Sequence, residues 1–141
     1  MLKYFLTGAH SGQMVTAVTP SIEYSDGLII KDMSKLYNKR NLVLKTSFWR
    51  NDKDERAEAW LVINIETSKG ESYFWHAIKT INDQETDIWK KIEGAVDLPP
   101  IRSMDDVIKI YLWNKDKKEI YMDDINVEFI QEEFEAKQTV K

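Results

Sequence analysis

The chain has 141 residues, of which 43% are hydrophobic and 11% aromatic, and its formal net charge is -4. This length suits one domain with a single core. The acidic balance argues against a nucleic-acid partner, which would need a concentrated basic patch. No apolar run approaches the roughly 20 residues of a membrane span. The absence of cysteine excludes a disulfide scaffold, a thiolate metal site and a cysteine nucleophile.

The first residues give an expectation about location. Residues 1–6 are too short for a secretory signal peptide and lack its small-residue cleavage site. We therefore expect an export signal or an upstream region to precede Met1 in the full protein. A chain without cysteine suits a bacterial envelope protein, so we predict a secreted or cell-envelope location.

Short strand-like segments follow one another along the chain, separated by turn residues. The first half is predicted to hold strands at residues 13–19, 21–24, 28–33 and 41–49. We expect residues 57–66 to pair with the strand at 41–49, because a single charged loop separates the two. Further strands are predicted at residues 72–79 and 89–98, where Trp89 is expected in the core and Pro99 and Pro100 end the segment.

The last third of the chain predicts two long strands joined by a charged turn. Residues 107–114 and 119–130 both alternate between apolar and polar side chains. Since only a few turn residues separate them, we expect these strands to pair directly as a hairpin. Residues 131–141 show no strand pattern and are predicted to form a charged tail.

About eight or nine short strands without a convincing helical stripe predict an all-β fold, a jelly-roll β-sandwich of two antiparallel sheets over residues 1–130. Alternation with period two assigns the side chains that lie between the sheets. These are Leu42, Leu44, Phe48, Leu61, Ile63, Ile108, Ile110, Leu112, Ile125, Val127 and Phe129.

Asp123 interrupts the apolar face of the last strand. Alternation puts Asp123 on the side of Tyr121 and Ile125, and Asp124 on the opposite, solvent side. A buried carboxylate is costly unless something compensates it. We therefore expect Asp123→Ala to destabilise the fold and Asp124→Ala to be tolerated.

Aromatic residues lie at outward positions of several strands. Flat rings in a groove suit sugars, because the C–H face of a pyranose packs on the ring while amides, carboxylates or arginine bind the hydroxyls. The alternative is that several rings fill the ends of the sandwich or lie under loops. The predicted ligand-binding residues are Trp49, Trp60, Tyr111 and Trp113, with Asn64 and Arg50 as polar partners.

Several short motifs resemble one known group of proteins. They are AHSG at residues 9–12, EYSDG at 23–27, SFW at 47–49, WLVINIE at 60–66 and the pair IYLWN and IYMDDINVE in the last third. Together they are similar to galactose-binding-like jelly-roll modules, the xylan- and glucan-binding carbohydrate-binding modules of bacterial secreted glycoside hydrolases and envelope proteins. The resemblance implies a non-catalytic module that binds a polysaccharide or oligosaccharide.

The resemblance also implies one structural calcium ion. Asp123 would supply a carboxylate, and Ser11 and Gln13 would supply backbone carbonyls, which are ligands that calcium prefers. The chain departs from the family in its first segment, KYFLTG, which lacks the carboxylate usual there. The alternative is that backbone N–H groups alone satisfy Asp123.

No constellation supports an enzyme. His10 and His76 lack metal-ligand spacing, and the chain has neither a nucleophile-elbow motif nor a phosphate-binding glycine loop. The leading hypothesis is a glycan-binding module of a larger exported protein. The alternative is a protein-interaction or structural β-sandwich domain of an envelope protein, with no sugar site.

Overall fold

The computed structural model describes residues 2–7, 16–18, 23–25, 27–53, 58–81, 86–115 and 118–131. These residues contain nine strands and no α-helix, hence no helix that could span a membrane. The strands are β1 (Leu2–Thr7), β2 (Thr16–Val18), β3 (Leu28–Ile30), β4 (Leu42–Asp52), β5 (Glu58–Glu66), β6 (Ser72–Ile81), β7 (Trp89–Asp97), β8 (Val107–Trp113) and β9 (Ile120–Gln131).

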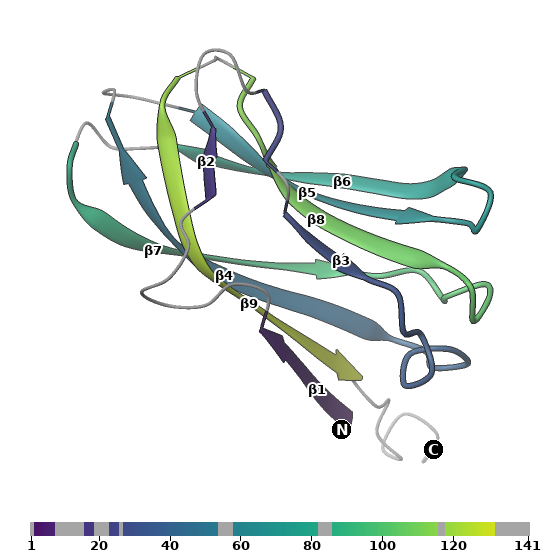
Figure 1. The fold of residues 1–141 in the computed structure, drawn as a ribbon. Helices are drawn as coiled ribbons and strands as arrows, with labels where there is room; N and C mark the ends of the chain where they lie inside the picture. Colours follow the sequence, from purple (N-terminus) through teal and green to yellow (C-terminus); the bar gives the residue numbers. More distant parts are fainter. Residues whose placement is uncertain are drawn as a thin grey trace, which may run out of the picture.

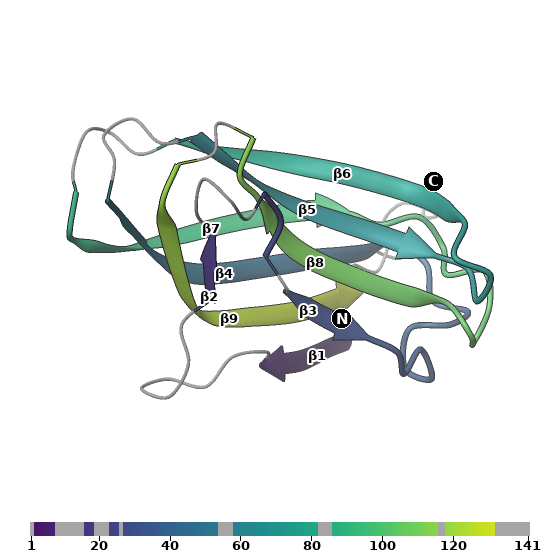
Figure 2. The ribbon, with the colours of Figure 1, turned by 45° about the horizontal axis from the view of Figure 1, so that its top comes forward.

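The strands form two antiparallel sheets that face each other (Figure 1). The five-stranded sheet has the order β1-β9-β4-β7, and β2 also pairs with β9. The four-stranded sheet has the order β3-β8-β5-β6. Figure 2, turned by 45°, shows the same two layers, with β8 and β5 at the middle of one and β9 and β4 at the middle of the other. The predicted all-β sandwich of two antiparallel sheets is confirmed.

The core lies between the sheets and is built from the inward side of each strand. In β4 and β8 every second side chain is buried, as period two requires. All of the predicted core residues, from Leu42 to Phe129, are buried to 3% exposure or less. Ile65, Met33 and Leu36 join the same core. The inward facing of these eleven core residues was therefore predicted correctly.

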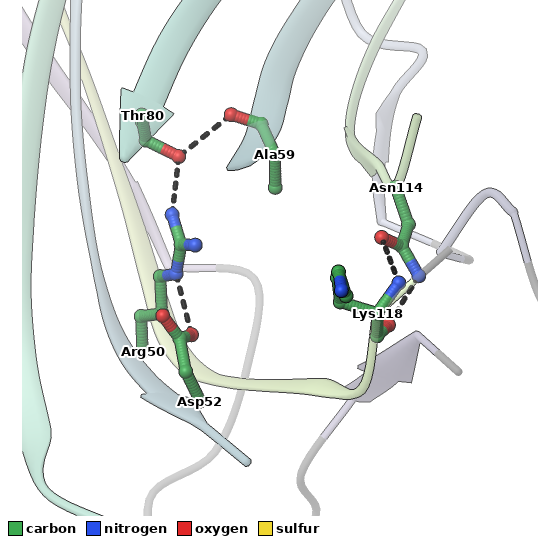
Figure 3. Close-up of polar contacts among 6 residues, drawn as sticks. All are labelled: Arg50, Asp52, Ala59, Thr80, Asn114 and Lys118. Atoms are coloured by element: carbon green, nitrogen blue, oxygen red, sulfur yellow. Dashed lines mark hydrogen bonds and ion pairs between the residues drawn. The ribbon is translucent and has the colours of Figure 1, made fainter. Parts of the chain in front are cut away.

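The predicted pairing of the last two long strands is wrong. β8 pairs with β3 and β5, whereas β9 pairs with β1, β2 and β4 in the other sheet. The short connection crosses between the sheets at Asn114, whose side chain is buried. Two hydrogen bonds join Asn114 to Lys118 (Figure 3). The Asn114 side-chain amide donates to the Lys118 carbonyl, and the Lys118 backbone N–H donates to the Asn114 side-chain oxygen at 2.9 Å. The two apolar faces thus meet across the core instead of lying side by side.

The predicted partner of β4 is wrong for the same reason. β5 does not pair with β4, because it lies in the four-stranded sheet between β8 and β6. The neighbours of β4 are β7 and β9. Two consecutive strands with apolar faces bury those faces equally well by pairing or by facing each other, and here they face each other.

A β-bulge in β9 corrects the predicted facing of Asp123. The register runs Ser47↔Asn126 and then Trp49↔Asp123, so Asp124 and Ile125 together oppose Phe48. Before the bulge Met122 is the buried residue, and after it Ile125 is. Asp123 opposes the outward-facing Trp49 and is only half-buried. It therefore lies on the outer face of the sheet, not in the core.

The bulge removes the basis for the expectation that Asp124→Ala is tolerated, because the backbone of Asp124 is in an unusual conformation. Asp124 has a φ of 53°, in the left-handed region that costs most L-residues about 1–2 kcal/mol. We expect Asp124→Val to destabilise the fold by about 1–2 kcal/mol, and Asp124→Gly to match or exceed wild-type stability. Urea denaturation of the two variants checks this, and equal losses from both would contradict the backbone explanation.

Candidate functional site

The structure divides the predicted ligand residues between two opposite surfaces. Trp49 lies on the outer face of the five-stranded sheet, because its neighbours Phe48 and Arg50 point inward and are buried. Trp60, Tyr111 and Trp113 lie on the outer face of the four-stranded sheet, in register between β5 and β8. The four rings therefore do not form one platform.

Arg50 points into the end of the core. Its Nε lies 2.6 Å from Oδ1 of Asp52, and its Nη1 donates to the Thr80 hydroxyl at 2.6 Å (Figure 3). Thr80 in turn donates to the carbonyl of Ala59 at 2.7 Å. Arg50 and Asp52 are each 3% exposed. This arrangement joins β4 of one sheet to β5 and β6 of the other, and it keeps the guanidinium away from both outer surfaces, so it does not support the predicted ligand role of Arg50.

Asn64 faces outward from β5 but is buried beneath its neighbours. Its Nδ2 donates to Glu66 at 2.6 Å, and the Ser72 hydroxyl donates to its Oδ1 at 2.5 Å. Lys109 of β8 pairs with Glu66 at 3.0 Å. The amide is thus part of a network that joins β5, β6 and β8, with a partner at each end.

The rings on the four-stranded sheet form one aromatic cluster, made of Tyr24, Trp60, Trp75, Tyr111 and Trp113. Trp113 is its centre: the Tyr24 ring stacks on it with centroids 6.1 Å apart, and the Trp75 ring meets it edge-on at 5.9 Å. Trp60 lies 6.3 Å away, and the Lys115 ammonium lies 5.8 Å above the Trp113 ring. Most contact surface of the inner rings is therefore taken up within the cluster.

A groove of about 660 Å³ crosses the outer face of the five-stranded sheet. Its walls come from β4, β7 and β9, which lie next to one another. The lining residues are Lys45, Thr46, Ser47, Lys91, Glu93, Gly94, Ala95, Asn126, Val127 and Glu128. Outward side chains form rows across these strands: Lys45 with Ala95 and Glu128, and Ser47 with Glu93 and Asn126.

The next row along the strands brings Trp49 beside the groove. It consists of Trp49, Lys91 and Asp123. The indole of Trp49 is 40% exposed, and among the described residues it contacts no other aromatic ring. An open ring face beside polar side chains is the arrangement that the sugar hypothesis requires.

The prediction that Trp89 belongs to the core is wrong. Its side chain is 42% exposed at the start of β7, an edge strand of the five-stranded sheet. It opposes Asn51, two residues beyond Trp49 on β4, so it lies on the same outer face as Trp49. Alternation in β7, where Val96 is buried, could have indicated an outward Trp89, because 89 and 96 differ by an odd number.

The predicted calcium ligands are only partly within the described residues. Ser11 and Gln13 lie outside them, so the calcium site stays a prediction. Asp123 has the right donor type, and one of its oxygens accepts the Asp124 N–H at 2.8 Å. Within the described ranges, no group of three histidine, aspartate or glutamate side chains is close enough to hold a metal.

Thermal unfolding distinguishes the two ways of satisfying Asp123. If calcium binds the folded chain and not the unfolded one, added calcium raises the Tm and a chelator lowers it. Asp123→Asn should remove that response, because it removes the carboxylate charge. If neither calcium nor the chelator changes the Tm, the Asp124 N–H remains as the partner of Asp123.

No protein-family model matches the chain, and no curated protein matches its sequence. Solved structures do match its fold. The CBM22-2 xylan-binding domain from Paenibacillus barcinonensis Xyn10C has a TM-score of 0.52 at 14% identity, over 86% of this chain and 89% of that one. The CBM22-1 and GH10 modules of Clostridium thermocellum xylanase 10B, complexed with xylohexaose, match with a TM-score of 0.52 at 13% identity. This match covers 94% of this chain and 27% of that one.

Another set of matches comes from a virus. The VP2 subviral particle of infectious bursal disease virus has a TM-score of 0.56 at 12% identity, over 92% of this chain and 32% of that one. The chain thus spans about a third of the viral chains that it matches. At these identities the likeness concerns the fold, and it confirms the predicted jelly-roll β-sandwich and supports the resemblance to carbohydrate-binding modules at that level.

Proposed function

We propose that the chain is a non-catalytic module that binds a polysaccharide or oligosaccharide in the groove of the five-stranded sheet. The observation that carries the proposal is the combination of this groove with the exposed indole of Trp49 at its end. A sugar ring packs its C–H face on such an indole and places its hydroxyls over the polar rows. The fold shared with xylan-binding domains supports the proposal.

The chemistry of the groove suits hydroxyl groups, which both donate and accept hydrogen bonds. Lys45 and Lys91 offer donors, and Glu93 and Glu128 offer acceptors. The amide of Asn126 and the hydroxyl of Ser47 offer both. Each of the three rows holds at least one donor and one acceptor, so a ligand meets both kinds along its length.

The aromatic cluster on the opposite sheet suits a sugar less well. Its rings already stack on or edge against one another, and lysine ammonium groups lie over Trp60 and Trp113. A pyranose needs an open ring face, and in this cluster only Tyr24 and Trp75 are more than half exposed. We therefore assign the glycan site to the groove and Trp49, and not to Trp60, Tyr111 and Trp113.

Replacing Trp49 tests the proposal. Trp49→Ala should weaken glycan binding by about 1–3 kcal/mol, the free energy of losing one packed ring. Its matched control is Trp75→Ala, since Trp75 is similarly exposed but lies on the other sheet. A glycan array identifies ligands, and isothermal titration calorimetry measures both variants. Equal losses from both variants would contradict a site at the groove.

The second candidate function is a protein-interaction or structural domain. The observation that favours it is the number of exposed apolar side chains on the four-stranded sheet, where Tyr24, Ile29 and Trp75 are each about half exposed. The viral particles with the same fold are compatible with such a role. If no polysaccharide changes the tryptophan fluorescence of the wild-type protein, this function replaces the glycan-binding one.

We further propose that the module belongs to a larger exported bacterial protein. The solved xylanase carries its CBM22-1 module beside a GH10 module in one chain. Localisation of the full-length protein by cell fractionation tests this part of the proposal.

A further inference from the structure

A second exposed tryptophan continues the row pattern of the groove. Beyond the row of Trp49, Lys91 and Asp123, the next outward row consists of Asn51, Trp89 and Tyr121. Trp89 and Trp49 are therefore diagonal neighbours on adjacent strands of one face. Residues related in this way lie about 7–8 Å apart, within reach of large aromatic side chains.

The indole of Trp89 is as accessible as that of Trp49. Trp89 is 42% exposed and Trp49 is 40% exposed. Among the described residues neither ring contacts another aromatic ring, unlike the rings of the aromatic cluster. Exposing two large indoles side by side costs free energy in water, and a ligand that covers both recovers it.

An unsatisfied polar atom lies beside Trp89. Asn51 opposes Trp89 in the register and is 8% exposed, and its Oδ1 has no hydrogen-bond partner among the described residues. A buried acceptor without a donor costs about 1–3 kcal/mol. A ligand hydroxyl would supply the missing donor, once a neighbouring side chain shifts to let it reach this atom.

We propose that Trp89 forms a second stacking subsite of the glycan groove, with the Asn51 amide as its hydrogen-bond acceptor. The inference rests on the proposed function and adds to it a ligand path along β4 and β7. From Lys45 to Asn51 that path covers six residue steps, or about 20 Å at ~3.3 Å per residue. The ligand is therefore a linear chain of several sugar units, and one of these units packs on Trp89.

Ligands of different length test the subsite. Xylobiose and xylohexaose, with cellohexaose as a second long probe, are titrated into the wild type, Trp49→Ala, Trp89→Ala and the control Trp75→Ala. We expect Trp89→Ala to weaken binding of the hexasaccharide by about tenfold or more, which is ~1.4 kcal/mol. Binding of the disaccharide should weaken by less than about twofold, because the proposed main site at Trp49 holds the shorter ligand. Trp89→Tyr should restore much of the affinity, because it keeps a ring.

The outcomes separate the subsite from the function on which it rests. If Trp49→Ala loses hexasaccharide affinity while Trp89→Ala binds as the wild type does, the subsite is refuted and the groove stands. If the wild type binds none of the probes, the proposed function fails for these glycans and the subsite fails with it. A loss in Trp89→Ala that Trp75→Ala reproduces would indicate a general loss of structure, and would also refute the subsite.

Discussion

Replacing Ile110 or Val127 with aspartate is expected to abolish folding. Ile110 of β8 is fully buried, and Val127 of β9 is 1% exposed. They project into the core from opposite sheets, so neither can turn a carboxylate toward water without opening the sandwich. The stability of a typical domain is about 5–15 kcal/mol. Burying an unpaired charge in this position costs more than that.

Ile29→Asp is the matched control for these substitutions. The substitution is chemically the same or similar, but Ile29 of β3 is 51% exposed. Its stability should change by no more than about half a kcal/mol, as at ordinary surface positions. Far-ultraviolet circular dichroism and thermal melts compare the three variants. A cooperative, wild-type-like melt of Ile110→Asp or Val127→Asp would contradict the assigned core.

The second large effect is expected at the buried ion pair of Arg50 and Asp52. Asp52→Ala removes the partner that lies 2.6 Å from the Arg50 Nε and leaves a guanidinium at 3% exposure. Removing one member of such a pair costs about 3–5 kcal/mol. The loss should be large because Arg50 also bonds Thr80 and so joins the two sheets at this end.

A double variant separates the charge from the packing. Arg50→Met combined with Asp52→Leu removes both charges and keeps apolar volume, so it should be far more stable than Asp52→Ala alone. Urea denaturation gives the free energy of unfolding of each variant. If Asp52→Ala changes that free energy by less than about half a kcal/mol, the pair is better solvated than its burial indicates.

The inward faces of β4, β5 and β8 could be predicted from the sequence, but the pairing of the strands could not. Alternation is a property of one strand, so Leu44 and Ile110 reveal their facing without any knowledge of neighbours. Pairing depends on which strands lie side by side, and two strands with apolar faces satisfy the same pattern in either arrangement. The buried Asn114, which turns the chain from β8 into the other sheet, ends the motif IYLWN, but alternation along that motif does not indicate the change of sheet.

The bulge in β9 could be predicted in part from the sequence. Ile120 and Met122 are buried at even positions, whereas Ile125, Val127 and Phe129 are buried at odd ones. This change of phase marks an extra residue between them, at the two aspartates. If the strand is instead treated as one continuous alternation, Asp123 is predicted on the apolar face, which is the wrong face of the sheet.

The site was predictable only in its residue types. Alternation showed that Trp49, Trp60 and Trp113 point outward, which the structure bears out. The sandwich has two outer faces, however, and deciding between them requires the strand order. Trp89 was put in the core for a different reason, because the alternation of β7 was not followed from Val96 back to its first residue. The missing strand order left out Tyr24, which reaches the aromatic cluster through a single isolated bridge to Trp113.

The position of β9 has a consequence for how the protein is made. β9 is the last strand that the structure describes, yet it pairs with β1, β2 and β4 in the middle of the five-stranded sheet. During synthesis β1 and β4 leave the ribosome long before their shared partner. The edges of β1 and β4 that pair with β9 stay unpaired until residue 131 has emerged, whereas β4 can already pair with β7, and β5 with β6. The segment from β1 to β8 therefore needs protection from aggregation until β9 has been made.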